Sequence, residues 1–209
     1  DDNLHINWYP GHMKKTKELV QNNLKLVDVV IELLDARIPY SSKNPQIDQI
    51  VGNKPRVVVL NKSDLANPAN LSKWVNYYAK KGIKAIPVST TKGNGVNKII
   101  EECKNVTREM MDNLKAKGRT ERAIRVMIVG VPNVGKSTLI NKLTGRKSTQ
   151  TGDKPGVTKS KQWVRLKGNL ELLDTPGILW PKFEDQEVAL NLAFSRAIKD
   201  EILDIDTLG

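Results

Sequence analysis

The feature that most constrains the fold is the segment Gly130-Val131-Pro132-Asn133-Val134-Gly135-Lys136-Ser137. It follows the apolar run Ile124–Val129 and precedes a helical pattern over Lys136–Leu143. This context is that of a phosphate-binding loop, whose glycines let backbone N–H groups and a helix N-terminus approach a phosphate. The unit predicts an α/β chain with a parallel sheet, because it joins a buried strand to a covering helix.

Two side chains of this loop are expected to act on the nucleotide directly. Lys136 should reach the β- and γ-phosphates, and the Ser137 hydroxyl should bind Mg²⁺. The other residues predicted to surround the phosphates are Gly130, Asn133, Val134, Gly135 and Thr138.

A second motif, Asn61-Lys62-Ser63-Asp64, follows the apolar run Arg56–Leu60. The Asp64 carboxylate can accept hydrogen bonds from N1–H and the 2-amino group of guanine, whereas adenine would leave it facing a lone pair. The alkyl stem of Lys62 would cover one face of the base. After the next apolar run, Ser89 and Thr90 fit a backbone loop that contacts the guanine carbonyl. Together the motifs predict a guanine nucleotide as ligand.

A third motif, Asp174-Thr175-Pro176-Gly177, lies at the end of the run Leu170–Leu173. Asp174 can hold the Mg²⁺ shell, and the Gly177 N–H can sense the γ-phosphate. Thr158 is the expected second Mg²⁺ ligand, because its neighbours Pro155 and Gly156 suit a loop that closes over phosphates; Thr151 is the alternative.

The order of these motifs is the reverse of that in a conventional GTPase, where the phosphate loop precedes the base motif. One nucleotide site is then assembled from a chain cut and rejoined at a different point. In this order the chain resembles the circularly permuted GTPases of the YlqF/YawG family. The segments that carry the resemblance, besides the motif order, are Trp8-Tyr9-Pro10-Gly11-His12-Met13, Asp35-Ala36-Arg37 and Asp174 to Pro181.

The resemblance implies a Ras-like P-loop GTPase fold, with a six-stranded, mostly parallel sheet and helices on both faces. It also implies a GTP-hydrolysing factor for late maturation of the large (50S) ribosomal subunit, with rRNA and ribosomal proteins as partners. Three parts are expected: an N-terminal arm and helix carrying His12 (1–26), the GTPase domain (27–185), and the start of a C-terminal helical region (186–209).

Catalysis must differ from that of many GTPases, because Ile178 stands where a water-positioning glutamine is common. The family resemblance links the segment of His12 to hydrolysis, so His12 is a candidate to orient the water; the alternative is an anchor or an RNA contact. Asn133 resembles the asparagine that holds K⁺ beside the phosphates in potassium-activated GTPases, and a loop-shaping amide is the alternative. A chain with this chemistry could be a molecular switch or an RNA-binding scaffold with incidental hydrolysis.

The charge distribution favours a polyanionic partner. The formal net charge is +11, and residues 142–167 carry eight Lys or Arg against Asp153 alone. Neutralised phosphates release counterions, so such clusters suit RNA. Aromatic residues make up only 5% of the chain and none is grouped as a base-stacking platform, so contact with the RNA backbone and shape is expected.

Composition also excludes several classes of protein. No stretch approaches the roughly 20 apolar residues of a membrane span, and the polar start is not a secretory signal. The single cysteine, Cys103, argues against a disulfide framework and against the zinc module common in permuted GTPases of the small subunit. A cytoplasmic protein is expected.

Alternating apolar and amphipathic stretches predict the elements. The predicted strands are Val27–Leu34, Arg56–Leu60, Lys84–Val88, Ile124–Val129, and an antiparallel hairpin of Gln162–Leu166 and Leu170–Leu173. The predicted helices are Lys14–Leu26, Pro45–Val51, Pro68–Lys81, Gly95–Lys117, Lys136–Leu143 and Glu187–Ile198. Asp35 and Arg37 are expected to form an ion pair that braces a loop, with an RNA or nucleotide contact of Arg37 as the alternative. Trp163 and Trp180 are expected to pack locally.

Overall fold

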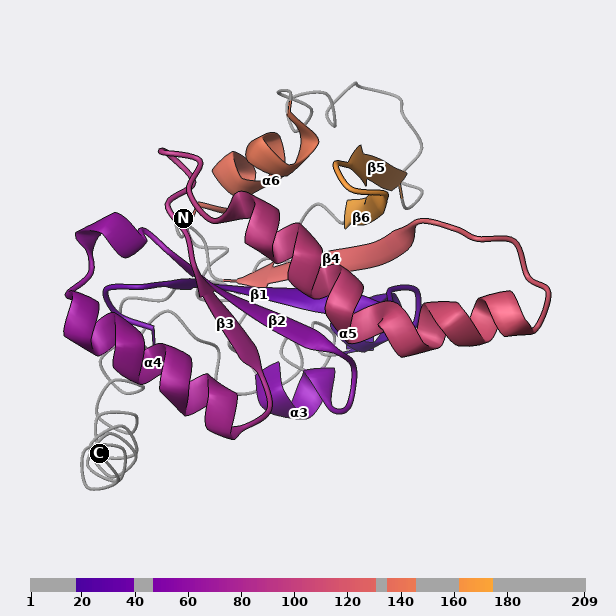
Figure 1. Cartoon of the computed structure of the whole chain (residues 1–209), viewed down its shortest axis with the longest axis horizontal. Helices are drawn as coiled ribbons and strands as arrows, with labels where there is room; N and C mark the ends of the chain where they lie inside the picture. Colours follow the sequence, from indigo (N-terminus) through magenta and orange to yellow (C-terminus); the bar gives the residue numbers. More distant parts are fainter. Residues whose placement is uncertain (1–17, 40–46, 131–134, 146–161, 175–209) are drawn as a thin grey trace.

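The computed structural model describes residues 18–39, 47–130, 135–145 and 162–174. Six strands form one sheet in the order β3-β2-β1-β4-β6-β5, and all neighbours run parallel except the β5–β6 pair (Figure 1). The predicted α/β class and the six-stranded, mostly parallel sheet are confirmed. The strands are β1 (Val29–Asp35), β2 (Arg56–Asn61), β3 (Lys84–Pro87), β4 (Ile124–Gly130), β5 (Gln162–Leu166) and β6 (Leu170–Asp174).

Helices cover both faces of this sheet. The helical elements are α3 (Ile47–Val51), the 3₁₀ turn η1 (Ser63–Leu65), α4 (Pro68–Lys80), α5 (Val96–Ala116) and α6 (Lys136–Thr144), and residues 18–24 are also helical. Apolar side chains of α5 and α6 pack on one face of the strands. Those of residues 18–24, α3 and α4 pack on the other face.

The central strand shows why the sequence lacks a simple apolar–polar alternation, although it contains the buried Glu32. Every residue of β1 is buried. Val29, Ile31 and Leu33 face the α5–α6 side, whereas Val30 and Leu34 face the opposite side. A strand covered on both faces needs apolar residues at both parities, so it loses the alternation of a half-exposed strand.

Two local signals of the sequence are confirmed. Asn67 caps α4 by accepting a hydrogen bond from the Ala69 N–H at 2.9 Å, and Pro68 occupies the first turn. The β5–β6 hairpin turns through Gly168 and Asn169, both at positive φ, and the Lys167 N–H donates to the Leu143 carbonyl at 2.9 Å. This last bond ties the hairpin to the end of α6.

Some predicted boundaries shift and others cannot be compared. The first strand begins at Val29 rather than Val27, and its end extends to Asp35. Three predictions fall wholly or partly outside the described residues. They concern the helix Glu187–Ile198, the first part of the helix Lys14–Leu26, and Trp180. Trp163 packs locally as expected, with Arg125 over its ring at 5.1 Å from the centroid. No helix of the described segments is long and apolar enough to cross a membrane.

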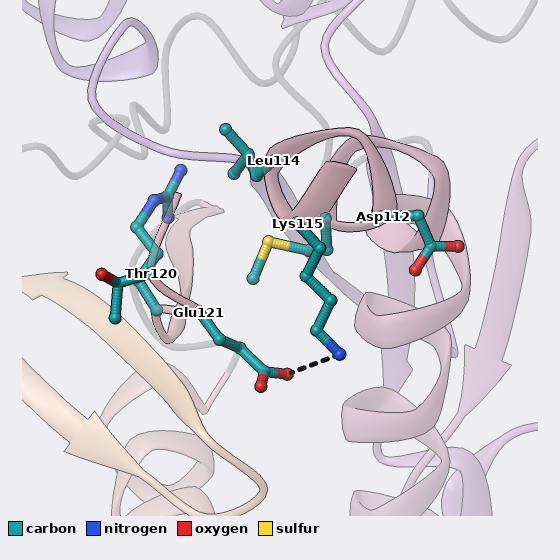
Figure 2. Close-up of a pocket in the computed structure, with 7 residues that line it drawn as sticks. Asp112, Leu114, Lys115, Thr120 and Glu121 are labelled. Atoms are coloured by element: carbon teal, nitrogen blue, oxygen red, sulfur yellow. Dashed lines mark ion pairs between the residues drawn. The ribbon is translucent and has the colours of Figure 1, made fainter. Parts of the chain in front are cut away.

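A small pocket lies where α5 leads into β4 (Figure 2). Its volume is about 60 Å³, and its lining includes Met111, Leu114 and Arg122. Small-molecule sites usually occupy roughly 300 Å³ or more. The pocket also lies at the amino end of β4, whereas the phosphate loop begins at the carboxyl end. It is therefore not the nucleotide site.

Candidate nucleotide-binding site

The predicted binding motifs meet at one edge of the sheet. In register, Asp35 at the end of β1 lies opposite Asn61 at the end of β2, and Leu33 lies opposite Gly130 at the end of β4. Asp174 ends β6, the other neighbour of β4. In an open α/β sheet, ligands bind in the crevice outside the carboxyl ends of the strands. The register thus brings the base motif and the phosphate loop together across β1.

The phosphate loop is described at its two ends. Gly130 ends β4, and Gly135 caps α6 with φ 94°, in the left-handed region that favours glycine. A Cβ atom on Gly135 would meet the Asn61 side-chain nitrogen. Lys136, Ser137 and Thr138 form the first turn of α6, where backbone N–H groups are available to an anion. Gly135 must therefore be glycine for conformational and for steric reasons.

Replacing Gly135 with Ala is expected to lower the free energy of unfolding by about 1–3 kcal/mol and to weaken GDP binding. The reason is the combined strain of positive φ and overpacking against Asn61. Urea unfolding and fluorescent-GDP titration measure the two effects. Gly118→Ala is the matched control. Gly118 also has positive φ, at 71°, but a Cβ atom there would meet nothing within 4 Å. It lies between α5 and β4, at the amino end of β4. Equal effects of the two substitutions would contradict the steric argument.

Asn61 joins three parts of the site. Its side chain is buried, at 1% exposure. Its Oδ1 accepts a hydrogen bond from the Thr90 N–H at 3.3 Å, and its Nδ2 abuts Gly135. The base motif, the turn after β3 and the phosphate loop are thereby fixed relative to one another.

The turn after β3 is closed by its own backbone. Ser89 and Asn94 exchange two hydrogen bonds of 3.1 Å, and Thr90 within the turn is buried. The Ser63 N–H donates to the Val88 carbonyl at 3.0 Å, so this turn is also attached to the base motif. Ser89 and Thr90 therefore lie beside Asn61 to Asp64, as the sequence predicts for a loop that contacts the base.

The Asp64 carboxylate faces a cation that the sequence analysis did not single out. The Lys92 ammonium lies 3.6 Å from Asp64 Oδ2, and the two side chains are 62% and 24% exposed. The pair joins the base motif to the turn after β3. A pairing of this kind depends on the spatial proximity of two loops, and the local sequence around Lys92 does not indicate it.

Asp35, Arg37 and Lys62 form a second cluster of charges. Arg37 donates from its backbone N and Nε to Asp35 Oδ1, at 2.9 and 3.0 Å, and from Nη2 to Oδ2 at 2.8 Å. The Lys62 ammonium lies 3.4 Å from Asp35 Oδ2. Burial acts to raise the pKa of Asp35, but the hydrogen bonds and charge of Arg37 and the charge of Lys62 outweigh it and hold this pKa below its usual value. The expected Asp35–Arg37 ion pair is confirmed, and Lys62 is an additional partner.

The described residues suit a Mg²⁺ ion that binds together with the nucleotide. No group of three or more His, Cys, Asp or Glu among them could hold a metal alone. Mg²⁺ at such sites takes most of its ligands from phosphate oxygens and water, with one or two protein groups. Ser137 is exposed in the first turn of α6, the helix that follows β4. Asp174 ends β6, the strand that pairs with β4.

Several predicted site residues lie outside the described residues. These are His12, Asn133, Val134, Thr158 and Gly177. The structure brings together the others, which are Asn61, Lys62, Ser63, Asp64, Ser89, Thr90, Gly130, Gly135, Lys136, Ser137, Thr138 and Asp174.

The sheet, the glycine-capped α6 and a base motif that precedes the phosphate loop define a circularly permuted P-loop GTPase. The chain is 53% identical over 205 residues to "Ribosome biogenesis GTPase A" of Priestia megaterium, covering 98% of this chain and 71% of that protein. It belongs to the ribosome biogenesis GTPase A (YlqF) family, and it is a GTPase.

Other comparisons agree with this assignment. "Ribosome biogenesis GTPase A" of Bacillus cereus is 54% identical over 204 residues, with 98% of this chain and 69% of that protein covered. The family model described as "50S ribosome-binding GTPase" matches residues 125–205. The crystal structure of GNP-bound YlqF from T. maritima superposes with a TM-score of 0.57 at 31% identity, covering 81% of this chain. The chain spans 60% of the length of that solved structure.

Proposed function

We propose that this GTPase acts in late maturation of the large ribosomal subunit and binds rRNA in a nucleotide-dependent way. Members of its family are named for ribosome biogenesis, and the matching family model is named for binding to the 50S subunit. The observation that carries the proposal is the placement of the guanine motif and the phosphate loop at one sheet edge. A basic surface elsewhere on the domain adds to it.

This surface lies where α5, α6 and the β5–β6 hairpin meet. The hairpin turn is at the amino end of β4, the end away from the phosphate loop. Gly168 of the hairpin lies against α5, where a Cβ atom on this glycine would stand 3.7 Å from Lys104 Cε. Lys167 lies beside Gly145 at the end of α6, and Lys142 is exposed in the last turn of that helix. Glu101, one turn before Lys104, offsets part of this charge. Flexible lysines at this density suit contacts with phosphates of the RNA backbone rather than with bases.

The proposed switch couples this binding to the nucleotide. GTP would order the loops that carry Thr158 and Gly177, and hydrolysis would release them. In this proposal residues 27–185 make the switch domain, residues 1–26 bring His12 to it, and residues 186–209 begin a helical region. Mg²⁺ would be held by Ser137, Thr158 and Asp174, and it would neutralise charge on the phosphates.

Hydrolysis is proposed to depend on His12 and on K⁺ held beside the phosphates by Asn133. A glutamine is absent after Gly177, since Ile178 follows, so another group must orient the attacking water. The isolated chain should therefore turn over slowly. A monovalent cation near the phosphates would stabilise developing charge, much as an arginine finger does.

Large-subunit precursors are expected to accelerate GTP hydrolysis by orders of magnitude in KCl. His12→Ala should lower this stimulated rate by about 10²-fold or more, because a positioned catalytic group typically contributes that much. Phosphate release is measured for both proteins with and without particles, in KCl and in NaCl. His5→Ala is the matched control, because His5 is the other histidine. An unchanged stimulated rate in His12→Ala would refute the role of His12, and equal rates in the two salts would refute that of K⁺.

The alternative function, an RNA-binding scaffold with incidental hydrolysis, makes a different prediction for the same assay. Precursor particles would then bind the protein in its GTP state without accelerating phosphate release. The slow intrinsic turnover expected from Ile178 is common to both functions, so only the stimulated rate separates them.

A further inference from the structure

The carboxylate of Asp35 is a buried charge at the centre of the nucleotide edge that the proposed chemistry does not use. Asp35 is 4% exposed and ends the central strand β1, between the strands that carry the base motif and the phosphate loop. Its backbone is fixed on one side, because the Ala36 N–H continues the ladder by donating to the Asn61 carbonyl at 2.7 Å. A buried carboxylate is stable only with partners, so its partners indicate its role.

Arg37 fixes the orientation of this carboxylate. The backbone N and Nε of Arg37 donate hydrogen bonds to Asp35 Oδ1, and Nη2 donates to Oδ2. This fork-like arrangement leaves little rotational freedom to the carboxylate. Oδ2 is shared with Lys62, whose ammonium lies 3.4 Å away.

Lys62 is held in an unusual backbone conformation at the same place. Its φ of 62° and ψ of 35° are left-handed, which is uncommon for a residue with a side chain. From the end of β2 its side chain reaches back to the end of β1, so its stem lies along the part of the edge between the base motif and the phosphate loop. The side chain is 30% exposed, so much of it is already packed.

We propose that Asp35 is a positioning residue for guanine-nucleotide binding: its carboxylate holds the Lys62 ammonium so that the Lys62 stem is placed to cover the base. The inference rests on the base-covering role proposed for Lys62. Holding a long, flexible side chain in its bound conformation before the ligand arrives lowers the ordering that binding requires, and so raises affinity. The Asp-Ala-Arg segment then serves the nucleotide site through Lys62 and not by a direct contact.

The test is a double-mutant cycle between Asp35 and Lys62 in the full chain, read out as affinity for a fluorescent GDP. Asp35→Asn keeps the shape and removes the charge. This substitution is expected to weaken GDP binding about tenfold, mainly through faster dissociation. Losing a charge-assisted contact has an effect of this size. Lys62→Met keeps an apolar stem without the ammonium and is expected to weaken binding by a similar factor. The double variant should be no weaker than either single variant, because both changes break one interaction.

Two results would overturn the inference: GDP affinity unchanged in Asp35→Asn, or losses that multiply in the double variant. A failure of the site itself is distinguishable, because the wild-type protein would then lack affinity for GDP. The control is Asp48→Asn, which breaks the 2.6 Å contact between Asp48 and Arg56 away from the nucleotide edge and should leave GDP affinity unchanged.

Stability is followed separately by thermal unfolding of the nucleotide-free proteins, so that a loss of fold is not counted as a loss of affinity. If Asp35→Asn does not fold, Asp35→Glu goes through the same cycle, because it keeps the charge and displaces it. Weakened binding that is coupled to Lys62 supports the inference, and binding that is independent of Lys62 contradicts it.

Discussion

Replacing Asp64 with Asn is expected to weaken GDP binding by about 10²–10⁴-fold and to shift the preference toward xanthine nucleotides. Hydrogen bonds to a charged group contribute roughly 1.5–3 kcal/mol each, and each 1.4 kcal/mol is about tenfold in affinity. An Asn amide would also direct a donor at the N–H groups of guanine. Xanthine presents a carbonyl at position 2, which can accept a hydrogen bond from that amide.

The measurement is a titration of wild type and Asp64→Asn with fluorescent GDP and, in competition, with xanthosine diphosphate. Asp112→Asn is the matched control, because it makes the same chemical change on α5 beside the small pocket of Figure 2. Its affinity for GDP should equal that of the wild type. Asp64→Asn with unchanged GDP affinity would show that this carboxylate does not read the base.

Replacing Arg122 with Ala is expected to lower the free energy of unfolding by about 2–3 kcal/mol. Arg122 donates two hydrogen bonds to Asp28, at 2.7 and 2.8 Å, and Asp28 also accepts from the Arg125 N–H at 2.8 Å. The Asp28 side chain is 7% exposed and that of Arg122 is 34% exposed. Removing one partner of a buried pair leaves a buried charge uncompensated; the estimate lies below the 3–5 kcal/mol typical of fully buried pairs because water reaches Arg122.

Urea unfolding of the nucleotide-free protein measures this effect. The control is Glu121→Ala, which removes the neighbouring ion pair of Lys115 and Glu121, drawn as a dashed line in Figure 2. Those side chains are 61% and 67% exposed, so the change should stay within about 0.5 kcal/mol. Equal losses for the two substitutions would contradict the role assigned to the Asp28–Arg122 pair.

The sequence predicts the sheet well because doubly buried strands are mostly apolar at both parities, with Glu32 of β1 as an exception. Its errors lie at the strand ends, where polar residues still pair. Four strands extend one residue beyond their predicted ends. Their last residues are Asp35, Asn61, Gly130 and Asp174. A hydropathy pattern depends on side chains, whereas the hydrogen bonds of a sheet are formed by the backbone. The predicted strand therefore ends one residue early where a binding residue follows. The 3₁₀ turn Ser63–Leu65 was missed for a related reason, since it is too short to show a period.

The site was predictable where a local motif carries it, as in the phosphate loop and the base motif. The contacts of Lys62 with Asp35 and of Lys92 with Asp64 were not, although all four residues are visible in the sequence. The first contact depends on the register that sets Asp35 opposite Asn61, and the second on how the turn after β3 folds. Such pairings arise from tertiary structure, and spacing along one chain does not encode them.

The central position of β1 has a consequence for how the protein is made. Because synthesis proceeds from the N-terminus, β1, β2 and β3, with α4 and α5, emerge before β4. The nascent chain then holds the base-recognising half of the sheet, with one edge of β1 open until β4 pairs with it. Such an edge can pair with other chains. Because the base motif precedes the phosphate loop, the nascent chain cannot use both motifs until Gly130–Ser137 has emerged. By then β4, the strand that covers the open edge of β1, has also been synthesised.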